Sequence, residues 1–542
     1  MKIIIPMAGV GQRFVDAGFT EIKPLIDIEG VPAIVHIVEM FGEGNDFVFV
    51  CNKDHQDTTP LDQVLNDTCP TGKVVWMDSH KKGPVYSTLS ALDYVDDGEE
   101  VFVNYCDLIN RWSFSDLVCE ARELNYDGAL SAFRGFHPVS LGHTDDPSRP
   151  AFAHMRVNGR NECLEVAEKR AFTDNRLNEF SSAGGHYFSR GRYLKKYFNE
   201  AIQKDIQVNG EYYVSLVFNL MIEDGLKVKV HEIDQHIGFG TPEDYYQYTF
   251  WSGYFRDIAD AANNRLELEN TTTCIPAAGP LEKSLWGDYK LPKPLIPVTK
   301  KPMFKVAIES LPQTDSLVMI CLKEHADEFN FDYFFHAEYP EARVVLLAEA
   351  TTGMASTCMQ AHDFFDSEQA LIVSGCDFSL RYDSEKLKSL ISDDNNDVIM
   401  FSYTGQRYVR RDPLSYTYLQ LNEGRVAFVS EKATISNDPR VDSIFAGAVY
   451  FRTATLFINA VKKMMREGKT IKGKYYVATA INELIKDEFR VVPFEVERFV
   501  TWSRALNLQE FEYWERYYDT SDRHPYQKIK ATIIRNGGDL LV

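Results

Sequence analysis

Runs of apolar residues alternate with amphipathic stretches at the start of the chain. "KIIIPM" (2–7) ends in a glycine-rich loop, "VPAIVHIVEMF" (31–41) has helical spacing, and "DFVFVCN" (46–52) is again apolar. The alternation continues with "KVVWMD" (73–78), "VYSTLSALDYV" (85–95) and "EEVFVNYCD" (99–107). Continuous apolar strands separated by helices are typical of a parallel sheet covered by helices on both faces. The sequence therefore predicts a Rossmann-like α/β fold.

The same pattern returns in the second half of the chain. Four positions of the first half recur 270 residues later, as Gly9/Gly279, Lys23/Lys293, Gly83/Gly353 and Asp107/Asp377. Later segments match at offsets of 262 to 263 residues, among them "VAEKRAF" with "VSEKATI" and "NGEYYVSLVF" with "KGKYYVATAI". A repeat of this length is a duplicated domain. We expect two tandem Rossmann-like domains, each a mostly parallel mixed sheet flanked by helices.

The domain boundaries follow from this repeat. We expect the first domain over 1–255, a helical linker over 256–270, the second domain over 271–520 and a C-terminal tail over 521–542. Near the end of the chain, Tyr513, Trp514, Tyr517 and Tyr518 have helical spacing. This pattern indicates a helix that packs back on the second domain.

Composition limits the partners and the compartment. The 542 residues carry a formal net charge of −21, which argues against nucleic acid or an anionic membrane as a partner. The nine cysteines include no C-x-x-C pair, and the apolar run after Met1 is too short to span a membrane. We therefore expect a cytoplasmic protein with reduced thiols. A homo-oligomer is left open.

The loop after the first apolar run carries the first chemical signal. Ala8-Gly9-Val10-Gly11-Gln12-Arg13 places small residues and a cation at the carboxyl edge of a parallel sheet, where open α/β folds bind ligands. A dinucleotide fingerprint is an alternative, since Glu29 lies 20 residues beyond Gly9. However, Phe14 stands where the third glycine should be, and Arg13 suits a polyphosphate better.

Five further motifs follow in order: Lys23-Pro24, Gly83 in "KKGPVYSTLSAL", Asp107, Glu168-Lys169 and "GFGTPEDY" (238–245). Together with the loop, they make the first domain similar to the sugar-phosphate nucleotidyltransferase family. The resemblance implies transfer of a nucleotidyl group from a nucleoside triphosphate to a sugar 1-phosphate or a similar small phosphate, with release of pyrophosphate. It also implies a place in surface polysaccharide synthesis. CTP or UTP is the favoured nucleotide, although the sequence does not fix the base.

The resemblance implies a role for each matching residue. The nucleotide would contact Ala8, Gly9, Gly11, Gly83 and Thr88. Arg13 would neutralise the leaving pyrophosphate, and Lys23 the phosphates near the reacting phosphorus. Asp107 would hold Mg²⁺, and the sugar phosphate would contact Glu168, Lys169 and Gly185. Catalysis would then consist of alignment and charge neutralisation.

Other interpretations of these residues remain open. Asp107 could cap the turn after a strand, and Lys169 could be a solvated surface lysine. Many family members carry a second metal-binding aspartate at the position of Gly238 in this chain. Either one carboxylate is enough here, or Asp234 or another acid takes its place.

The second copy departs from the first in its loop. Leu281 and Lys283 stand at the positions of Gly11 and Arg13, whereas six residues persist: Gly279, Lys293, Gly353, Asp377, Glu431 and Lys432. This pattern fits either a second transferase or a regulatory binding copy. Two rival functions for the whole chain are a glycosyltransferase of the related nucleotide-sugar fold and a non-catalytic scaffold that senses nucleotide sugars. The chain has no D-x-D motif at Asp107 or Asp377, which argues against a glycosyltransferase. Intact Arg13, Lys23 and Asp107 argue against a non-catalytic scaffold.

Overall fold

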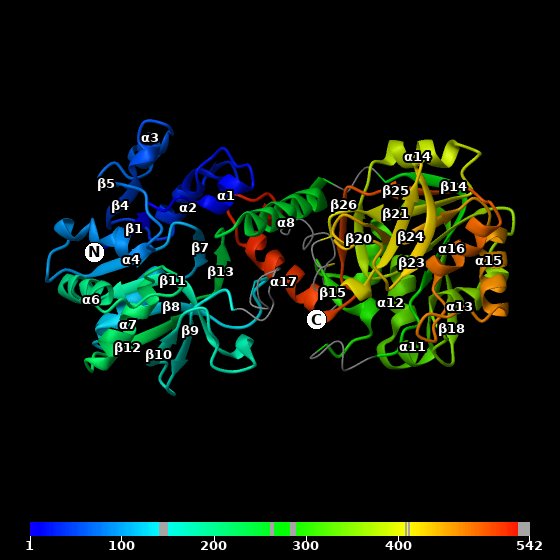
Figure 1. Ribbon diagram of the computed structural model, residues 1–542. Coiled ribbons are helices and arrows are strands. Elements are labelled where there is room, and N and C mark those ends of the chain that lie inside the picture. The colour runs from blue at the N-terminus through cyan, green and yellow to red at the C-terminus, as the bar shows by residue number, and fades with distance from the viewer. Residues whose placement is uncertain (140–149, 261–264, 282–288, 407–408, 410–411, 529–542) are drawn as a thin grey trace. The chain divides into compact units, whose positions relative to one another are not determined.

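The computed structural model describes residues 1–139, 150–260, 265–281, 289–406, 409 and 412–528 (Figure 1). The chain divides into two compact units, Met1–Ser252 and Gly253–Val542. The division falls within helix α8 (Pro242–Asp260). None of the described helices is both long enough and apolar enough to cross a membrane.

The first unit alternates strands and helices from its first residues. Its strands are β1 (Lys2–Met7), β2 (Asp27–Ile28), β3 (Val31–Pro32), β4 (Asp46–Asn52), β5 (Lys73–Met77), β6 (Val101–Asn104), β7 (Leu108–Arg111), β8 (Gly128–Phe133), β9 (His154–Val157), β10 (Cys163–Ala167), β11 (Phe180–Phe188), β12 (Val228–Glu232) and β13 (Gln235–Gly238). Its helices before α8 are α1 (Gln12–Asp16), α2 (Ala33–Glu39), α3 (Leu61–Thr68), α4 (Pro84–Leu89), α5 (Phe114–Glu123), α6 (Gly191–Gln203) and α7 (Val214–Glu223).

A nine-stranded mixed sheet forms the centre of this unit. Its strand order is β10-β9-β11-β6-β1-β4-β5, and β8 joins β11 to β12. Strands β1, β4, β5 and β6 are parallel, with Ile4 opposite both Val48 and Val103, whereas β11 is antiparallel to β6. The carboxyl ends of β1, β4 and β6 therefore meet at one edge of the sheet, where the loops that follow them can assemble a site.

Successive residues of β1 pack on opposite faces of the sheet, as the pleat of a strand requires. Ile4 belongs to a core with residues of α4, α6 and α7, and Ile3 and Ile5 belong to a second core with residues of α2, α3 and α5. All three isoleucines have no exposed surface, and burying such a side chain contributes about 1.5–3 kcal/mol. Two cores on two faces make a helix–sheet–helix sandwich, and Figure 1 shows α6 and α7 side by side on one of those faces.

The second unit repeats this arrangement strand for strand. Its strands are β14 (Glu267–Pro276), β15 (Pro297–Val298), β16 (Lys301–Pro302), β17 (Gln313–Leu322), β18 (Arg343–Leu347), β19 (Ala370–Ser374), β20 (Phe378–Arg381), β21 (Val398–Tyr403), β22 (Thr417–Asn422), β23 (Arg425–Glu431), β24 (Ser443–Phe451), β25 (Val491–Glu495) and β26 (Arg498–Thr501). The helices described in this unit are α10 (Met303–Glu309), α11 (Lys323–Phe329), α12 (Phe331–Glu338), α13 (Met354–Met359), α14 (Ser384–Ser392), α15 (Ala454–Arg466), α16 (Val477–Lys486) and α17 (Ala505–Asp519). The second sheet has the order β18-β17-β14-β19-β24-β21-β25, which matches β5-β4-β1-β6-β11-β8-β12 of the first. The predicted fold class is thereby confirmed.

The expected helical linker over 256–270 needs a correction. Strand β14 begins at Glu267, and its residues Thr271, Thr272 and Thr273 are buried. The three threonines lie just past the expected linker; they are β-branched and suit a strand that pairs in parallel with β17 and β19. The aromatic residues near the chain end lie on α17, where Tyr513, Trp514, Tyr517 and Tyr518 are buried.

Candidate active site

The loop after β1 begins the site. Ala8 is fully buried, while Gly9 is exposed and its backbone pairs with His80 in a single parallel bridge. Gly11 is the residue that caps the start of α1. Its φ of +65° is a backbone conformation in which an L side chain would be strained. Arg13 follows on α1 with an exposed side chain. The loop therefore presents open backbone and one cation at the carboxyl edge of the sheet.

Lys23 and Asp107 form the central ion pair. Lys23 begins the short 3-10 turn Lys23–Leu25, and its Nζ lies 2.6 Å from Asp107 Oδ2 and donates to the carbonyl of Gly240 at 3.3 Å. Asp107 lies between β6 and β7, and its carbonyl accepts from the N–H of Phe239 at 2.6 Å. Two sequence-predicted residues, separated by 84 positions, are thus brought into direct contact.

Each member of this pair stabilises the charged form of the other. Burial alone would lower the pKa of Lys23, but the Asp107 carboxylate outweighs it and the pKa is raised. Burial alone would raise the pKa of Asp107, yet Lys23 holds that pKa below its ordinary value. Both groups are therefore charged at neutral pH.

A second acid lies close to this pair and was not predicted. Asp244 Oδ2 accepts from the N–H and the hydroxyl of Thr241, both at 2.8 Å, and Thr241 Oγ1 accepts from the Asp244 N–H at 3.2 Å. This is a capping box at the start of α8, with Pro242 at the first helical position. Oδ2 of Asp107 and Oδ2 of Asp244 both lie 3.6 Å from the point where a side chain at Gly240 would begin. Burial raises the pKa of Asp244 to about 6.

Gly238, where the family places a metal-binding aspartate, lies opposite Leu108, the residue after Asp107. Asp234 lies beyond the other end of the same four-residue strand, since its N–H bonds to Arg111. The nearby acid is therefore Asp244 and not Asp234. The pattern Thr-Pro-Glu-Asp identifies Asp244 as part of a helix cap, but it does not show that this cap lies beside Asp107.

The Glu168-Lys169 motif makes hydrogen bonds to Ser215, in the first turn of α7, and to Tyr213, the residue that precedes α7. Glu168 accepts from the Ser215 hydroxyl at 2.6 Å, and burial raises the pKa of Glu168. Lys169 Nζ donates to the Tyr213 hydroxyl at 2.5 Å and lies 4.8 Å from the centre of the Tyr213 ring. The side chain of Asn219 fixes the preceding strand, because it bonds to both the N–H and the carbonyl of Val166 at 2.9 Å.

Two tyrosines connect these groups into one site. Tyr213 donates to Glu211, and the charges of Glu211, Glu168 and Arg13 all act on the pKa of Tyr213, which burial raises. Tyr105 accepts from the N–H of Val214 at 3.3 Å, and its pKa, raised by burial, is also affected by Glu168 and Asp107. Arg13 and Glu168 therefore lie near Tyr213, which also bonds to Lys169, and Glu168 and Asp107 lie near Tyr105. The sequence analysis did not single out either tyrosine.

Three predicted site residues have evident packing roles. Gly83 has φ +85°, and a Cβ there would lie 2.8 Å from the backbone nitrogen of Tyr212. Thr88 is fully buried and donates to the carbonyl of Pro84 at 2.8 Å. Gly185 is buried in β11, and Ser131 and Phe102 cover it where a side chain would project. Ligand contacts of these three residues stay a prediction.

The second unit repeats much of this geometry. Lys293 pairs with Asp377 in the position of Lys23 and Asp107. Gly353 packs against the backbone of Tyr475, as Gly83 packs against Tyr212, and Gly279 is exposed with open space around it. Lys283 and Glu282 lie outside the described residues.

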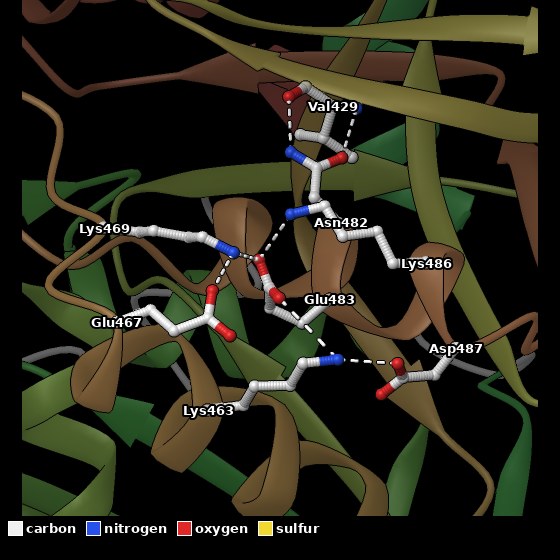
Figure 2. A network of polar contacts seen from close by, with 8 residues as sticks. All are labelled: Val429, Lys463, Glu467, Lys469, Asn482, Glu483, Lys486 and Asp487. Carbon is white, nitrogen blue, oxygen red and sulfur yellow. Dashed lines mark hydrogen bonds and ion pairs between the residues drawn. The ribbon is translucent and has the colours of Figure 1, made fainter.

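The acceptor-side motif is also repeated. Glu431 accepts from the Thr417 hydroxyl at 2.5 Å, and Lys432 lies 5.0 Å from the centre of the Tyr476 ring. Asn482 bonds to both backbone groups of Val429, as Asn219 does to Val166 (Figure 2). Positive φ angles of 52° at Lys169 and 57° at Lys432 show that the backbone turns in the same way in both copies.

Among the described residues of the second unit, the aligned positions carry neither the threonine nor the acid of the capping box. When the start of α17 is aligned with the start of α8, Arg504 stands at the position of Thr241 and Asn507 at the position of Asp244. Arg504 instead pairs with Asp412 and donates to Ser415. At the aligned positions the second unit therefore keeps the carboxylate of Asp377 but has Asn507 in place of Asp244.

The donors around Asp107 suit a hard divalent cation. Among the described residues no group of three or more His, Cys, Asp or Glu side chains gathers as a metal cage. Mg²⁺, however, is typically held by one or two carboxylates together with substrate phosphates. The Asp107 carboxylate beside Asp244 meets that requirement.

Protein-family models match one segment in each half of the chain. Residues 3–171 match the model of the MobA-like NTP transferase domain, and residues 288–503 match the model named nucleotidyl transferase. No curated protein matches the chain.

Solved structures similar to single parts of the chain include several sugar nucleotidyltransferases. A nucleoside-diphosphate-sugar pyrophosphorylase from Vibrio cholerae RC9 is 20% identical, with 45% of this chain and 98% of that chain covered and a TM-score of 0.37. An inositol-1-phosphate CTP transferase from T. maritima is 15% identical, with 46% and 96% covered and a TM-score of 0.36. A UDP-glucose pyrophosphorylase complexed with UDP-glucose is 14% identical, with 47% and 98% covered and a TM-score of 0.37. The two family matches, together with the repeated sheet and the repeated lysine–aspartate pair, show that this chain consists mainly of two nucleotidyltransferase domains in tandem.

Proposed function

We propose that the first domain transfers a nucleotidyl group from a nucleoside triphosphate to a sugar phosphate or a similar polyol phosphate, with release of pyrophosphate. The observation that carries this proposal is the convergence of Arg13, the Lys23–Asp107 pair and the Glu168-Lys169 motif on one edge of the sheet. Three cations at one edge can neutralise a triphosphate and a second phosphate at once.

In this proposal each side chain acts through charge and position. Lys23 neutralises phosphate oxygens near the reacting phosphorus, and exposed Arg13 neutralises the pyrophosphate that leaves. Lys169 binds the phosphate of the acceptor, whose own oxygen attacks in line and needs no general base. Mg²⁺, held by Asp107, would neutralise charge that develops on the transferred group.

The acceptor-side roles have a further support in Tyr213. Its hydroxyl holds Lys169 at 2.5 Å, and its ring lies below the same ammonium group. The ammonium is therefore fixed in place before a phosphate arrives, which reduces the entropy lost on binding. We also propose that the product serves surface polysaccharide synthesis in the cytoplasm, on the strength of the family resemblance alone.

A screen of pyrophosphate release tests the proposal. The purified full-length chain with Mg²⁺ is supplied with each of the four nucleoside triphosphates and a panel of sugar 1-phosphates and polyol phosphates. We expect release with one nucleotide and one acceptor class, dependent on both. Pyrophosphate release that is independent of every acceptor, or absent from every combination, would contradict the proposal.

A further inference from the structure

One tight turn is built identically in the two domains but carries opposite charge. In the first domain the turn is Val208–Glu211, and in the second it is Ile471–Lys474. In both, the first and last residues pair in an antiparallel bridge, and the two residues between them have positive φ angles. These are the backbone angles of a two-residue hairpin turn. The last residue of the turn is Glu211 in one copy and Lys474 in the other.

The glycine that packs against each turn fixes where this last side chain begins. The point where a side chain at Gly83 would start lies 3.1 Å from Cβ of Glu211. The corresponding point at Gly353 lies 3.2 Å from Cβ of Lys474. Glu211 and Lys474 therefore leave the backbone at equivalent places beside the predicted site.

In the first domain Glu211 balances the acceptor-side lysine. Tyr213 donates to Glu211 and accepts from Lys169, so that the carboxylate and the ammonium are joined through one hydroxyl. In the second domain Lys432 keeps its place over the Tyr476 ring, and Lys474 is exposed. Within the described parts of the chain, no carboxylate forms an ion pair with either of these two lysines. Replacing a glutamate by a lysine raises the local charge by two units.

A second difference points the same way. In the first domain the hydroxyl of Tyr105 accepts from the N–H of Val214 at the start of α7. Gly375 stands at the position of Tyr105 and cannot supply a hydroxyl to Val477 at the start of α16. The start of a helix carries partial positive charge, and α16 keeps it without this partner. The change from Glu211 to Lys474 therefore makes the second site more positive, and the missing hydroxyl leaves the partial charge at the start of α16 open to an anion.

We propose that the phosphorylated ligand of the second domain carries a further anionic group, a second phosphate or a carboxylate, that binds Lys474. The ligand of the first domain, in contrast, carries no such group beside Glu211. This inference rests on the proposed assignment of Lys169 to the acceptor phosphate and on the equivalent place of Lys432 over the Tyr476 ring. It makes residues 211 and 474 determinants of specificity between two acceptors of different charge.

Calorimetric titration of the full-length chain tests this inference. Glucose 1-phosphate and glucose 1,6-bisphosphate serve as the singly and doubly phosphorylated probes, and K169A disables the first site so that only the second is measured. In K169A we expect the bisphosphate to bind at least about tenfold more tightly than the monophosphate. Adding K474E should remove that preference, and adding K474R should keep it. Conversely, E211K in a K432A background should create the preference in the first domain.

The outcomes separate this inference from the proposed function. If the bisphosphate shows no preference for K169A, or if K474E weakens both probes equally, the inference is wrong. The same holds if neither probe binds to K169A. None of these results affects pyrophosphate release by the first domain of the unmodified chain, which alone decides the proposed function.

Discussion

The Nζ of Lys23 lies 2.6 Å from Oδ2 of Asp107, and the same pair recurs as Lys293 and Asp377. A lysine and an aspartate stay together in both copies of this diverged repeat, together with the glycine contact and the acceptor-side motif that both copies also share. Around the lysine–aspartate pair the copies differ, in the second acid, in Tyr105 and in the charge of residue 211. The shared pair and the differing surroundings lead to separate predictions for the two domains.

Asp107→Asn is expected to reduce pyrophosphate release by roughly 10²–10³-fold or more, because a preorganised charge in a partly buried site is lost. The fold should survive, since asparagine has the same shape and can still accept from Lys23. Initial rates at saturating Mg²⁺ and thermal unfolding measure the two effects. Asp377→Asn is the matched control, and it should leave this activity within a few-fold. A near-normal rate for Asp107→Asn would show that another acid, with Asp244 the nearest, holds the metal.

Lys169→Ala is expected to raise KM for the acceptor more than KM for the nucleotide. The loss of a charge-assisted hydrogen bond costs about 1.5–3 kcal/mol, or roughly 10- to 100-fold. Tyr213→Phe keeps the ring under Lys169 but removes its hydroxyl, so a smaller rise in the same KM should follow. Lys432→Ala, the equivalent change in the second domain, is the control. A rise confined to KM for the nucleotide would contradict the assignment of this motif.

Most of the fold and part of the site could be predicted from the sequence. Apolar runs identify the buried strands, and the offset of 270 residues aligns Lys23 with Lys293 and Asp107 with Asp377 in the sequence. Asp244 was missed because its pattern is that of a helix cap, and nothing local shows that the cap lies against Asp107. Tyr105 and Tyr213 were missed because an aromatic residue beside a strand is ordinarily core. The start of β14 was missed because Glu267, Glu269 and Asn270 are polar residues that do not favour strands.

Glu483 gives a pH-dependent test of stability in the second domain. It is 2% exposed and accepts from Lys469 at 2.7 Å and Lys486 at 3.0 Å, with Lys463 nearby (Figure 2). Burial alone would raise its pKa, but the lysines outweigh burial and the pKa lies below its ordinary value. The stabilisation is therefore full above the pKa of the unfolded chain, about 4.3, and is lost as the pH falls through the folded value.

Glu483→Gln should consequently destabilise the second domain at pH 7 by an amount on the order of 2 kcal/mol. The difference from the unmodified chain should shrink as the pH falls below about 4.3. Urea denaturation at several pH values measures it. Glu467→Gln, at a more exposed partner of Lys469, is the control and should change stability by less than about 1 kcal/mol. A difference that is constant with pH would mean that the charge of Glu483 is not what stabilises this network.

The combination of Arg13→Ala and Asp107→Asn decides whether the chain has one catalytic domain or two. The second domain lacks the acid of the capping box, since Asn507 stands at the position of Asp244. Its loop carries Leu281 at the position of Gly11, where a side chain hinders close approach of phosphate to the backbone. We therefore expect the doubly substituted chain to release no pyrophosphate from any nucleoside triphosphate, with any acceptor of the panel. Residual release that disappears when Asp377→Asn is added would contradict this expectation. The second domain would then be a transferase in its own right, and the changes at residues 281, 375 and 474 would mark a change of substrate instead of a loss of catalysis.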